Sequence, residues 1–368
     1  MMRAELAAPL PWSTAGRAQS DTTRILPLTV VIPAHNRAVM LRRALESVAA
    51  QAPSRPSEVI VIDDASSDGT PEVAESMGAR VIRHNRNLGP GVARNSGITA
   101  ARQPWIALLD SDDEWHAHHL DALWHLRGNH VLVAASVVVR AGAPATERFS
   151  GPVSRRPVIL TSPSALVYPQ NFVSTSATMI RRRALLDAGA YRPELRRSED
   201  LDLLLRVLEQ GTGIVTPEIG VVYHEHPRQA SRQRQAMRAA HQDVAASYIG
   251  RAWMSSSLLR RMSGAMQWDE LRAALASGQK LEALKQARLV LSHPERALGA
   301  AGLLAWRRLG RDRGSAMRHS GRASAGGAGA GARSSRRVVS RVIEALLLHA
   351  VDLVPITATP PSGGRQGL

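Results

Sequence analysis

Short apolar runs alternate with segments of helical periodicity along the first part of the chain. Between the first two runs, Leu41, Leu45 and Val48 recur at helical spacing, and Thr70 before Pro71 indicates the start of another helix. Strands that alternate with helices predict an α/β fold with a mainly parallel central sheet flanked by helices. The apolar runs that predict buried strands are 28–32, 58–62, 80–83, 105–109 and 131–139.

Beyond residue 139 the pattern changes. Residues 140–173 carry prolines and are predicted to be irregular, and residues 232–310 have a helical pattern. Residues 320–335 consist of Gly, Ala, Ser and Arg, a composition typical of a flexible linker, and 338–353 are predicted to form a short amphipathic helix. The other predicted elements are strands at 175–180 and 213–223 and helices at 182–188 and 199–210.

The composition excludes several kinds of chemistry. The 368 residues fit one large or two medium domains and contain no cysteine, which excludes disulfides, zinc ribbons, iron–sulfur clusters and cysteine nucleophiles. A net charge of +16 and a pI near 11.4 favour a polyanion partner, such as nucleic acid or an acidic membrane surface. All basic residues except Lys280 and Lys285 are arginines, however, and a coding bias explains that excess equally well.

Polar residues follow three of the predicted strands. The first strand leads into His35-Asn36-Arg37, the second into Asp63-Asp64, and the fourth into Asp110-Ser111-Asp112. The carboxyl ends of parallel strands meet at one edge of an open sheet, and ligands bind there. The sequence therefore predicts a ligand site at this edge.

The two carboxylates of Asp110 and Asp112 suit a divalent cation. Residues i and i+2 of an extended segment point to the same face, so both side chains can approach one Mg²⁺ or Mn²⁺ ion together with the phosphates of a substrate. The alternative is an exposed acidic turn. We further expect Asp64, with Asp63, to accept hydrogen bonds from a base or a ribose, whereas Asp68 and Thr70 are expected to cap the following helix.

A glycine-containing helix start follows the third predicted strand. Glycines in the segment 89–97 allow close approach of a ligand to the backbone, and a helix N-terminus favours anions. Arg94 lies on this helix and is predicted to face a diphosphate or a nucleotide, with a structural ion pair as the alternative. The spacing matches neither a P-loop nor a dinucleotide-binding fingerprint.

Five stretches of the chain, taken in order, resemble family-2 glycosyltransferases, which are nucleotide-sugar-dependent enzymes with the Rossmann-like GT-A fold. Together they cover about residues 28–226. The stretches are Val30-Val-Ile-Pro-Ala-His-Asn-Arg37, Val61-Ile-Asp-Asp-Ala-Ser-Ser-Asp-Gly-Thr70, Gly89-Pro-Gly-Val-Ala-Arg-Asn-Ser-Gly97, Leu109-Asp-Ser-Asp-Asp113 and Ser198-Glu-Asp-Leu-Asp202.

The resemblance implies a role for each matching residue. Asp112 would bind a divalent metal, Mg²⁺ or Mn²⁺, with Asp110 and His226 as further ligands. Asp200 would be the general base that deprotonates the acceptor hydroxyl, so that direct displacement inverts the anomeric centre. The alternative for Asp200 is a helix N-terminal acid that complements the helix dipole. The residues implied to bind the donor are Pro33, Ala34, His35, Arg37, Asp63, Asp64, Arg94, Asp110 and Ser111.

The implied function is the transfer of a sugar from a UDP-, GDP- or TDP-sugar to a glycan, a lipid-linked acceptor or a small molecule, in polysaccharide, glycan or glycolipid synthesis. Two alternatives are a metal-dependent nucleotidyltransferase that uses the same carboxylates and a basic nucleic-acid-binding protein. The second predicts basic residues interleaved with aromatic ones, yet aromatic residues make up only 4% of the chain. No nucleic-acid partner is therefore expected.

Four regions and a location are predicted from these patterns. We expect a disordered leader over 1–24, a glycosyltransferase catalytic domain over 25–230, a helical C-terminal extension over 231–315 and a flexible basic tail over 316–368. Residues 307–368 hold eleven arginines against three acidic residues, which favours contact with an anionic membrane or another protein, with a disordered extension as the alternative. Without a signal peptide or a membrane-spanning run, the chain is predicted to be cytoplasmic, at most peripheral at the inner face of the membrane.

Overall fold

The computed structural model describes residues 23–141, 146–152, 154–168, 171–225, 233–293 and 295–302. The described part falls into two compact units, of which the first ends at Ser255 and the second begins at Ser256 and also includes Tyr168. Residues 1–22 of the predicted leader, the whole predicted tail at 316–368, residues 303–315 of the predicted extension and His226 lie outside the described residues. The helix at 234–247 belongs to the first of these units, and the predicted bounds of the catalytic domain and the extension stay a prediction.

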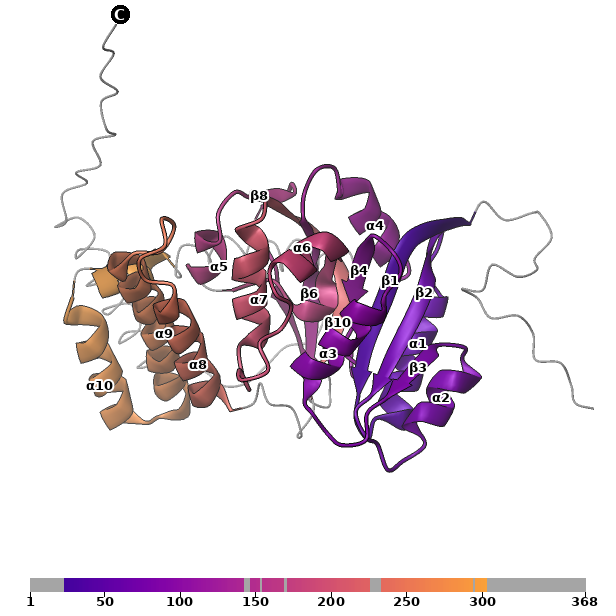
Figure 1. The fold of residues 1–368 in the computed structure, drawn as a ribbon. Coiled ribbons are helices and arrows are strands. Elements are labelled where there is room, and N and C mark those ends of the chain that lie inside the picture. Colours follow the sequence, from indigo (N-terminus) through magenta and orange to yellow (C-terminus); the bar gives the residue numbers. More distant parts are fainter. Residues whose placement is uncertain are drawn as a thin grey trace, which may run out of the picture. The chain divides into compact units, whose positions relative to one another are not determined.

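Ten strands of the described residues form one sheet in the first unit, in the order β3-β2-β1-β4-β9-β6-β10-β5, with β7 beside β6 and β8 beside β10. Strands β1 and β2 of this sheet lie side by side in Figure 1. Strands β1, β2, β3, β4, β6 and β10 run in one direction and the other four run against them. The predicted mainly parallel α/β sheet is therefore confirmed. The strands are β1 Arg24–Ala34, β2 Ser54–Asp63, β3 Arg80–Arg83, β4 Trp105–Leu108, β5 Glu114–Trp115, β6 Leu132–Ala141, β7 Thr146–Ser150, β8 Val158–Leu160, β9 Thr178–Arg181 and β10 Gly213–His224.

Most helices of the first unit lie where the sequence predicted them, but those at 119–126 and 164–167 were not predicted. Leu41, Leu45 and Val48 are all buried on one face of α1, as their spacing predicted. A Cβ added to Gly97 of α3 would lie only 2.4 Å from Val31 Cγ1, so this helix packs against the sheet more closely than a larger residue allows. The helices are α1 Ala38–Ala49, α2 Thr70–Ser76, α3 Pro90–Ala100, α4 His119–Leu126, α5 Ser164–Val167, α6 Arg182–Asp187, α7 Glu199–Leu208 and α8 Arg234–Ser247, with a 3₁₀ turn, η1, at Thr175–Ala177.

The second unit is helical where it is described. Helices α9 (Ser256–Ser277) and α10 (Lys280–Leu291) bury Trp268 and Leu271, and residues 295–302 form a further helical segment. Two glycines allow α9 and the segment 295–302 to touch. A Cβ on Gly264 would lie 2.0 Å from the backbone oxygen of Arg296, and a Cβ on Gly299 would lie 1.9 Å from the backbone oxygen of Arg261. No helix in the described part of the chain is long and apolar enough to cross a membrane.

A buried histidine couples the fold of the first unit to pH. His119 begins α4, is 2% exposed, stacks on Trp115 at 4.8 Å between ring centroids, and finds no hydrogen-bond partner for either ring nitrogen among the described residues. Burial, and secondarily the nearby His116, lowers the pKa of His119 to about 3. The imidazole is therefore neutral in the fold and gains a proton on unfolding at any pH between about 3 and 6.5.

We expect the stability of the protein to fall on acidification below pH 6.5 partly through His119. The unfolded chain binds the extra proton, so this residue contributes a slope of at most about 1.4 kcal/mol per pH unit to the free energy of unfolding. Urea denaturation at pH 7 and pH 5 should show a smaller acid loss for His119→Leu than for the unchanged protein. His118→Leu, at an exposed neighbour, should lose as much free energy of unfolding between pH 7 and pH 5 as the unchanged protein does. An equal loss in all three proteins would contradict the role of His119.

Candidate functional site

The loops after β1 and β2 are bonded to one another at the carboxyl edge of the sheet. His35 Nδ1 lies 2.8 Å from the backbone oxygen of Asp64, and the backbone N–H of Asn36 donates to Ser66 Oγ at 2.9 Å. Asn36 has a positive φ of 52°, a backbone conformation that asparagine tolerates better than most residues. The predicted donor residue His35 is therefore fixed in place by the loop that carries Asp64.

The start of α1 is held by the next loop as well. The Arg37 amide donates to Thr70 Oγ1 at 2.9 Å and the Ala38 amide to Asp68 Oδ2 at 3.3 Å. Asp68 also accepts the amide of Thr70 at 3.0 Å, in agreement with its predicted role at the start of α2. Pro33 and Ala34, the end of β1, are buried in the ladder with β2. Thr70 does not cap α2 as predicted: it is the first residue of that helix, after Gly69 at the N-cap position, and its Oγ1 accepts the Arg37 backbone amide at the start of α1 instead.

Asp63 is fully buried and faces its own loop. Its Oδ1 accepts the Ser66 amide at 3.0 Å, and its Oδ2 lies 3.0 Å from Arg83 Nε at the end of β3. Both carboxylate oxygens therefore have partners within the protein. Its predicted contact with a nucleoside stays a prediction.

Asp64 holds the loop that leads into α3. It is 3% exposed, and its carboxylate accepts the amides of Leu88 at 3.0 Å and Gly89 at 2.8 Å and lies 2.7 Å from His84 Nδ1. Gly89 has a positive φ of 90°, a conformation that glycine adopts readily, where the chain turns into α3. Asp64 thus positions the glycine-containing helix start, and its predicted contact with a nucleoside also stays a prediction.

Arg94 joins two parts of the site that are far apart in the sequence. Its Nη2 lies 2.5 Å from Asp110 Oδ1, at the end of β4, and its Nη1 lies 3.5 Å from Glu199 Oε1, at the start of α7. The guanidinium also lies over the ring of Tyr191, 5.2 Å from its centroid. Burial alone would lower the pKa of Arg94, but the charges of Asp110 and Glu199 raise it. Arg94 therefore stays a cation even though only 5% of its surface is exposed.

The run of carboxylates after β4 includes one that the sequence-based prediction omitted. Asp113 is buried, its Oδ2 accepts the Ser176 hydroxyl at 2.5 Å, and its Oδ1 has no hydrogen-bond partner among the described residues. Burial, with the nearby charges of Asp110 and Asp112, raises the pKa of Asp113 well above its usual range. Ser176 also accepts the Asp110 amide at 3.1 Å, so η1 fixes this run at two points.

The donor set fits a divalent cation only in partnership with a substrate. Asp112 is partly exposed and Asp110 keeps one carboxylate oxygen away from Arg94, while Ser111 between them is buried. Across the described residues, no three His, Asp or Glu side chains are grouped so as to hold a metal ion by themselves. Mg²⁺ is commonly held by one or two carboxylates together with substrate phosphates, so Asp110 and Asp112 have the right chemistry for such a shared site.

The acidic start of α7 is fixed from both sides. Ser198, just before the helix, has a positive φ of 57° and is buried, with its Oγ 2.8 Å from His241 Nδ1. Asp200 Oδ1 accepts the amide of Leu201 at 2.8 Å. Burial and the neighbouring Asp200 raise the pKa of Glu199. The positive charge of Arg94 lowers this pKa but only partly offsets the rise. Arg94 therefore links Glu199 to Asp110, and Asp200 lies next to Glu199 in the chain.

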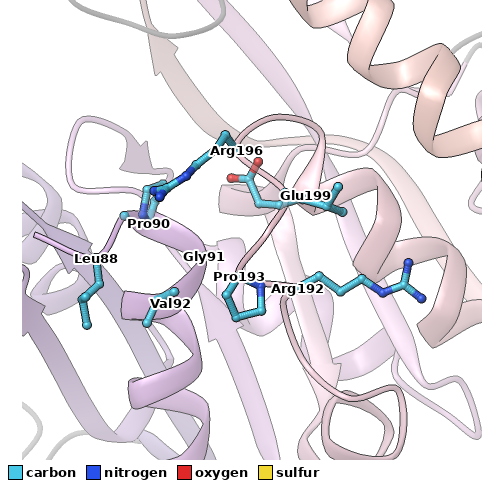
Figure 2. Close-up of a pocket in the computed structure, with 10 residues that line it drawn as sticks. Leu88, Pro90, Gly91, Val92, Arg192, Pro193, Arg196 and Glu199 are labelled. Atoms are coloured by element: carbon cyan, nitrogen blue, oxygen red, sulfur yellow. The ribbon is translucent and has the colours of Figure 1, made fainter.

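A pocket opens between the first turn of α3 and the segment that leads into α7 (Figure 2). Glu199 lies in its wall, whereas Asp200 does not. Glu199 and Arg196 were absent from the predicted site residues, although Glu199 directly precedes Asp200 in the sequence. The lining residues are Leu88, Gly89, Pro90, Gly91, Val92, Arg192, Pro193, Leu195, Arg196 and Glu199.

The fold is shared with glycosyltransferases of known structure. The crystal structure of S. aureus TarS 1–349 in complex with UDP-GlcNAc aligns with a TM-score of 0.55 at 16% sequence identity, over 75% of this chain and 83% of that one. A second structure of TarS 1–349, in complex with UDP, aligns with a TM-score of 0.52 at 15% identity, over 75% and 82%. These similarities establish an α/β fold of the GT-A class.

The sequence comparisons give the same class of protein over the first part of the chain. Residues 29–189 match the model of glycosyl transferase family 2. The succinoglycan biosynthesis protein ExoO of Rhizobium meliloti is 33% identical over 57% of this chain and 64% of its own length. The pre-mycofactocin glycosyltransferase of Mycobacterium tuberculosis is 30% identical over 55% of this chain and 43% of its own length. Residues 29–189 are therefore similar to glycosyltransferase family 2, and the chain spans less than two thirds of each of these relatives.

Proposed function

We propose that this protein is an inverting glycosyltransferase that moves a sugar from a nucleoside-diphosphate sugar to an acceptor hydroxyl in polysaccharide, glycan or glycolipid synthesis. One observation carries the proposal within this family: buried Arg94 joins Asp110 at the donor edge of the sheet to Glu199 at the start of α7. This link supports a site in which the proposed donor-binding Asp110 lies near the start of α7, where the proposed base Asp200 stands. The similar proteins named above support neither a nucleotidyltransferase nor a nucleic-acid-binding protein.

In the proposed mechanism, Asp112 and Asp110 would hold a divalent cation, Mg²⁺ or Mn²⁺. Such a cation would supply Lewis-acid stabilisation of the negative charge that develops on the leaving diphosphate. Asp200 accepts the proton of the acceptor hydroxyl while that oxygen attacks the anomeric carbon, and the nucleoside diphosphate departs from the opposite face. The anomeric configuration is inverted because one displacement occurs. Arg94 fixes Asp110 at the donor side and Glu199 beside the base.

The donor and the acceptor are proposed from the relatives. TarS has been crystallised with UDP-GlcNAc and with UDP, so UDP-sugars are the first donors to test, before GDP- and TDP-sugars. The names of ExoO and of the pre-mycofactocin enzyme suggest a polysaccharide or a small molecule as acceptor. Contact of the basic tail with anionic lipid also remains a proposal, because that tail lies outside the described residues.

The proposed function is tested by donor turnover. The purified full chain, incubated with Mn²⁺ or Mg²⁺ and a panel of UDP-, GDP- and TDP-sugars, should bind at least one donor and release its nucleoside diphosphate slowly to water or rapidly with an acceptor. Chelation with EDTA should abolish this release. A protein that binds no nucleotide sugar but binds DNA tightly would contradict the proposal.

Replacing Asp112 with asparagine should remove the metal-dependent part of donor binding. An amide has no negative charge and is a weaker ligand for a hard divalent cation than a carboxylate. Calorimetric titration with the preferred donor should show a stronger affinity with Mn²⁺ than with EDTA for the unchanged protein, and no difference for Asp112→Asn. Asp187→Asn, at a carboxylate of α6 paired with Arg183, is the control and should keep the difference. A full metal effect in Asp112→Asn would refute its role as a ligand.

A further inference from the structure

Helix α10 of the second unit carries leucines on its outer side. Leu281 is 85% exposed, Leu284 is 69% exposed and Leu291 is 48% exposed, although α10 packs beside α9 (Figure 1). A surface helix normally turns its large apolar residues to the core and its polar residues to water. In α10 this pattern is reversed. The residues that this helix buries are Ala283, Gln286 and Val290.

The three leucines form one surface. Single exposed apolar residues are common on proteins and need no explanation. Of the eight large apolar residues that are exposed in the described part of the chain, however, three lie on this helix of twelve residues. Leu284 follows Leu281 by three positions and precedes Leu291 by seven, which places all three along the same side of the helix.

Basic residues share this side of α10. Lys280, Lys285 and Arg288 are exposed there, and we call them and the three leucines the leucine face. Glu282 is the single acid of the helix, and its Oε1 accepts Gln286 Nε2 at 2.6 Å, on the buried side. Lys285 Nζ lies 3.8 Å from Glu282 Oε2, so this acid offsets only part of the charge. The leucine face therefore combines apolar surface with an excess of positive charge.

We propose that the leucine face of α10 binds to the surface of an anionic phospholipid bilayer. The leucines would enter the boundary between the headgroups and the acyl chains, while the basic side chains contact lipid phosphates, as in interfacial amphipathic helices. With twelve residues, α10 is shorter than the roughly 20 that cross a bilayer, so it would lie along the surface. The proposal concerns a surface other than the basic tail at 316–368, and it does not depend on the proposed transfer reaction.

The charge of the leucine face favours lipid over a second copy of this chain. A two-fold contact would place the same face against itself, so Lys280, Lys285 and Arg288 of both copies would converge and repel one another. An anionic bilayer complements both features, because its phosphates attract the cations and its acyl chains accept the leucines.

A fluorophore on the leucine face tests the contact directly. Because the chain contains no cysteine, Leu284→Cys provides a single labelling site for an environment-sensitive dye on the full chain. We expect its emission to rise and shift to shorter wavelength with vesicles of equal parts phosphatidylcholine and phosphatidylglycerol, and to stay unchanged with phosphatidylcholine alone. Val39→Cys, at a residue of α1 that is 83% exposed, is the control and should show no shift. No response from Leu284→Cys, or an equal response at both positions, would overturn the proposal.

Vesicle sedimentation separates the leucine face from the basic tail. The double variant Leu281→Ser with Leu284→Ser keeps every charge of the full chain. It should bind the anionic vesicles roughly tenfold or more weakly, since two apolar side chains no longer leave water on binding. The control, Val39→Ser with Ile159→Ser, changes two exposed apolar residues of the first unit and should bind as the unchanged protein does. Equal affinity in the leucine variant would assign vesicle binding to another part of the chain and overturn the proposal.

Two measurements without vesicles test the other occupants of the leucine face. In sedimentation velocity, a dimer of the unchanged protein that dissociates in Leu281→Ser with Leu284→Ser would identify a second copy as the occupant and overturn the proposal. In thermal melting, we expect the same Tm for both proteins, because exposed side chains have little to lose. A marked loss of Tm would show that the chain itself covers these leucines, which would overturn it as well.

Discussion

Replacement of Arg94 with alanine should both destabilise the protein and abolish glycosyl transfer. Asp110 and Glu199 would lose the cation that bonds to both, and two partly buried carboxylates would face one another without compensation. Removal of one partner from a buried ion pair costs about 3–5 kcal/mol of folding free energy. Urea denaturation should show a loss of this order, and donor turnover should fall to background even at temperatures where the variant stays folded.

Two further variants show whether the geometry of Arg94 or only its charge is needed. Arg94→Lys keeps a positive charge but not the planar fork that reaches two carboxylates at once, so it should recover part of the stability and little of the turnover. Arg183→Ala, which breaks an exposed ion pair with Asp187 on α6, should change neither measurement appreciably. Normal turnover in Arg94→Ala would show that the link between Asp110 and Glu199 is not needed for function.

Replacement of Asp200 with asparagine should leave donor binding intact and remove transfer. The amide keeps an oxygen that can accept the Leu201 amide, as the carboxylate does at 2.8 Å, so the start of α7 should be preserved. It cannot accept a proton from the acceptor hydroxyl, and general-base catalysis is typically worth about 10²–10⁴ in rate. Initial rates with the preferred donor and acceptor should fall by this factor while the Kd for the donor stays unchanged.

The adjacent acid provides the comparison for Asp200. Glu199→Gln should weaken the contact with Arg94 and reduce turnover less than Asp200→Asn, because Asp200 is the proposed base. Glu194→Gln, at an exposed acid of the same segment, should have normal turnover. If Glu199→Gln is as inactive as expected for Asp200→Asn, and Asp200→Asn stays active, the base is Glu199, whose carboxyl lies in the pocket wall.

The sequence predicted most of the sheet because burial on both faces leaves a simple signal. Strands such as β1 and β4 are continuous apolar runs, and α1 shows its buried face in the spacing of Leu41, Leu45 and Val48. The two-residue strand β5 was missed since Glu114 and Trp115 have no periodicity to detect. Strands β7 and β8 were missed because they lie in the segment 140–173, where prolines suggested an irregular course.

The candidate site was predicted at the level of loops, but its contacts could not be. The three strand ends that carry polar residues do lie at one edge, as a parallel sheet requires. No periodicity, however, indicates that Asp64 accepts amides 24 and 25 residues later, or that Arg94 lies close to Glu199, 105 residues away. Such long-range pairs depend on the packing of α3 and α7, which local patterns do not encode.

The bonds between the loops after β1 and β2 have a consequence for the redesign of this protein. Ser66 Oγ accepts the backbone amide of Asn36, Asn36 Oδ1 accepts the backbone amide of Ser67, and Thr70 Oγ1 accepts that of Arg37, so the two loops satisfy one another's polar groups. A chimera that takes residues 35–38 from a relative and keeps residues 63–70 of this chain would combine two loops whose side chains do not match in their hydrogen bonds. Exchange of both segments at once should preserve the folded edge, so that donor preference is transferred as a two-segment cassette.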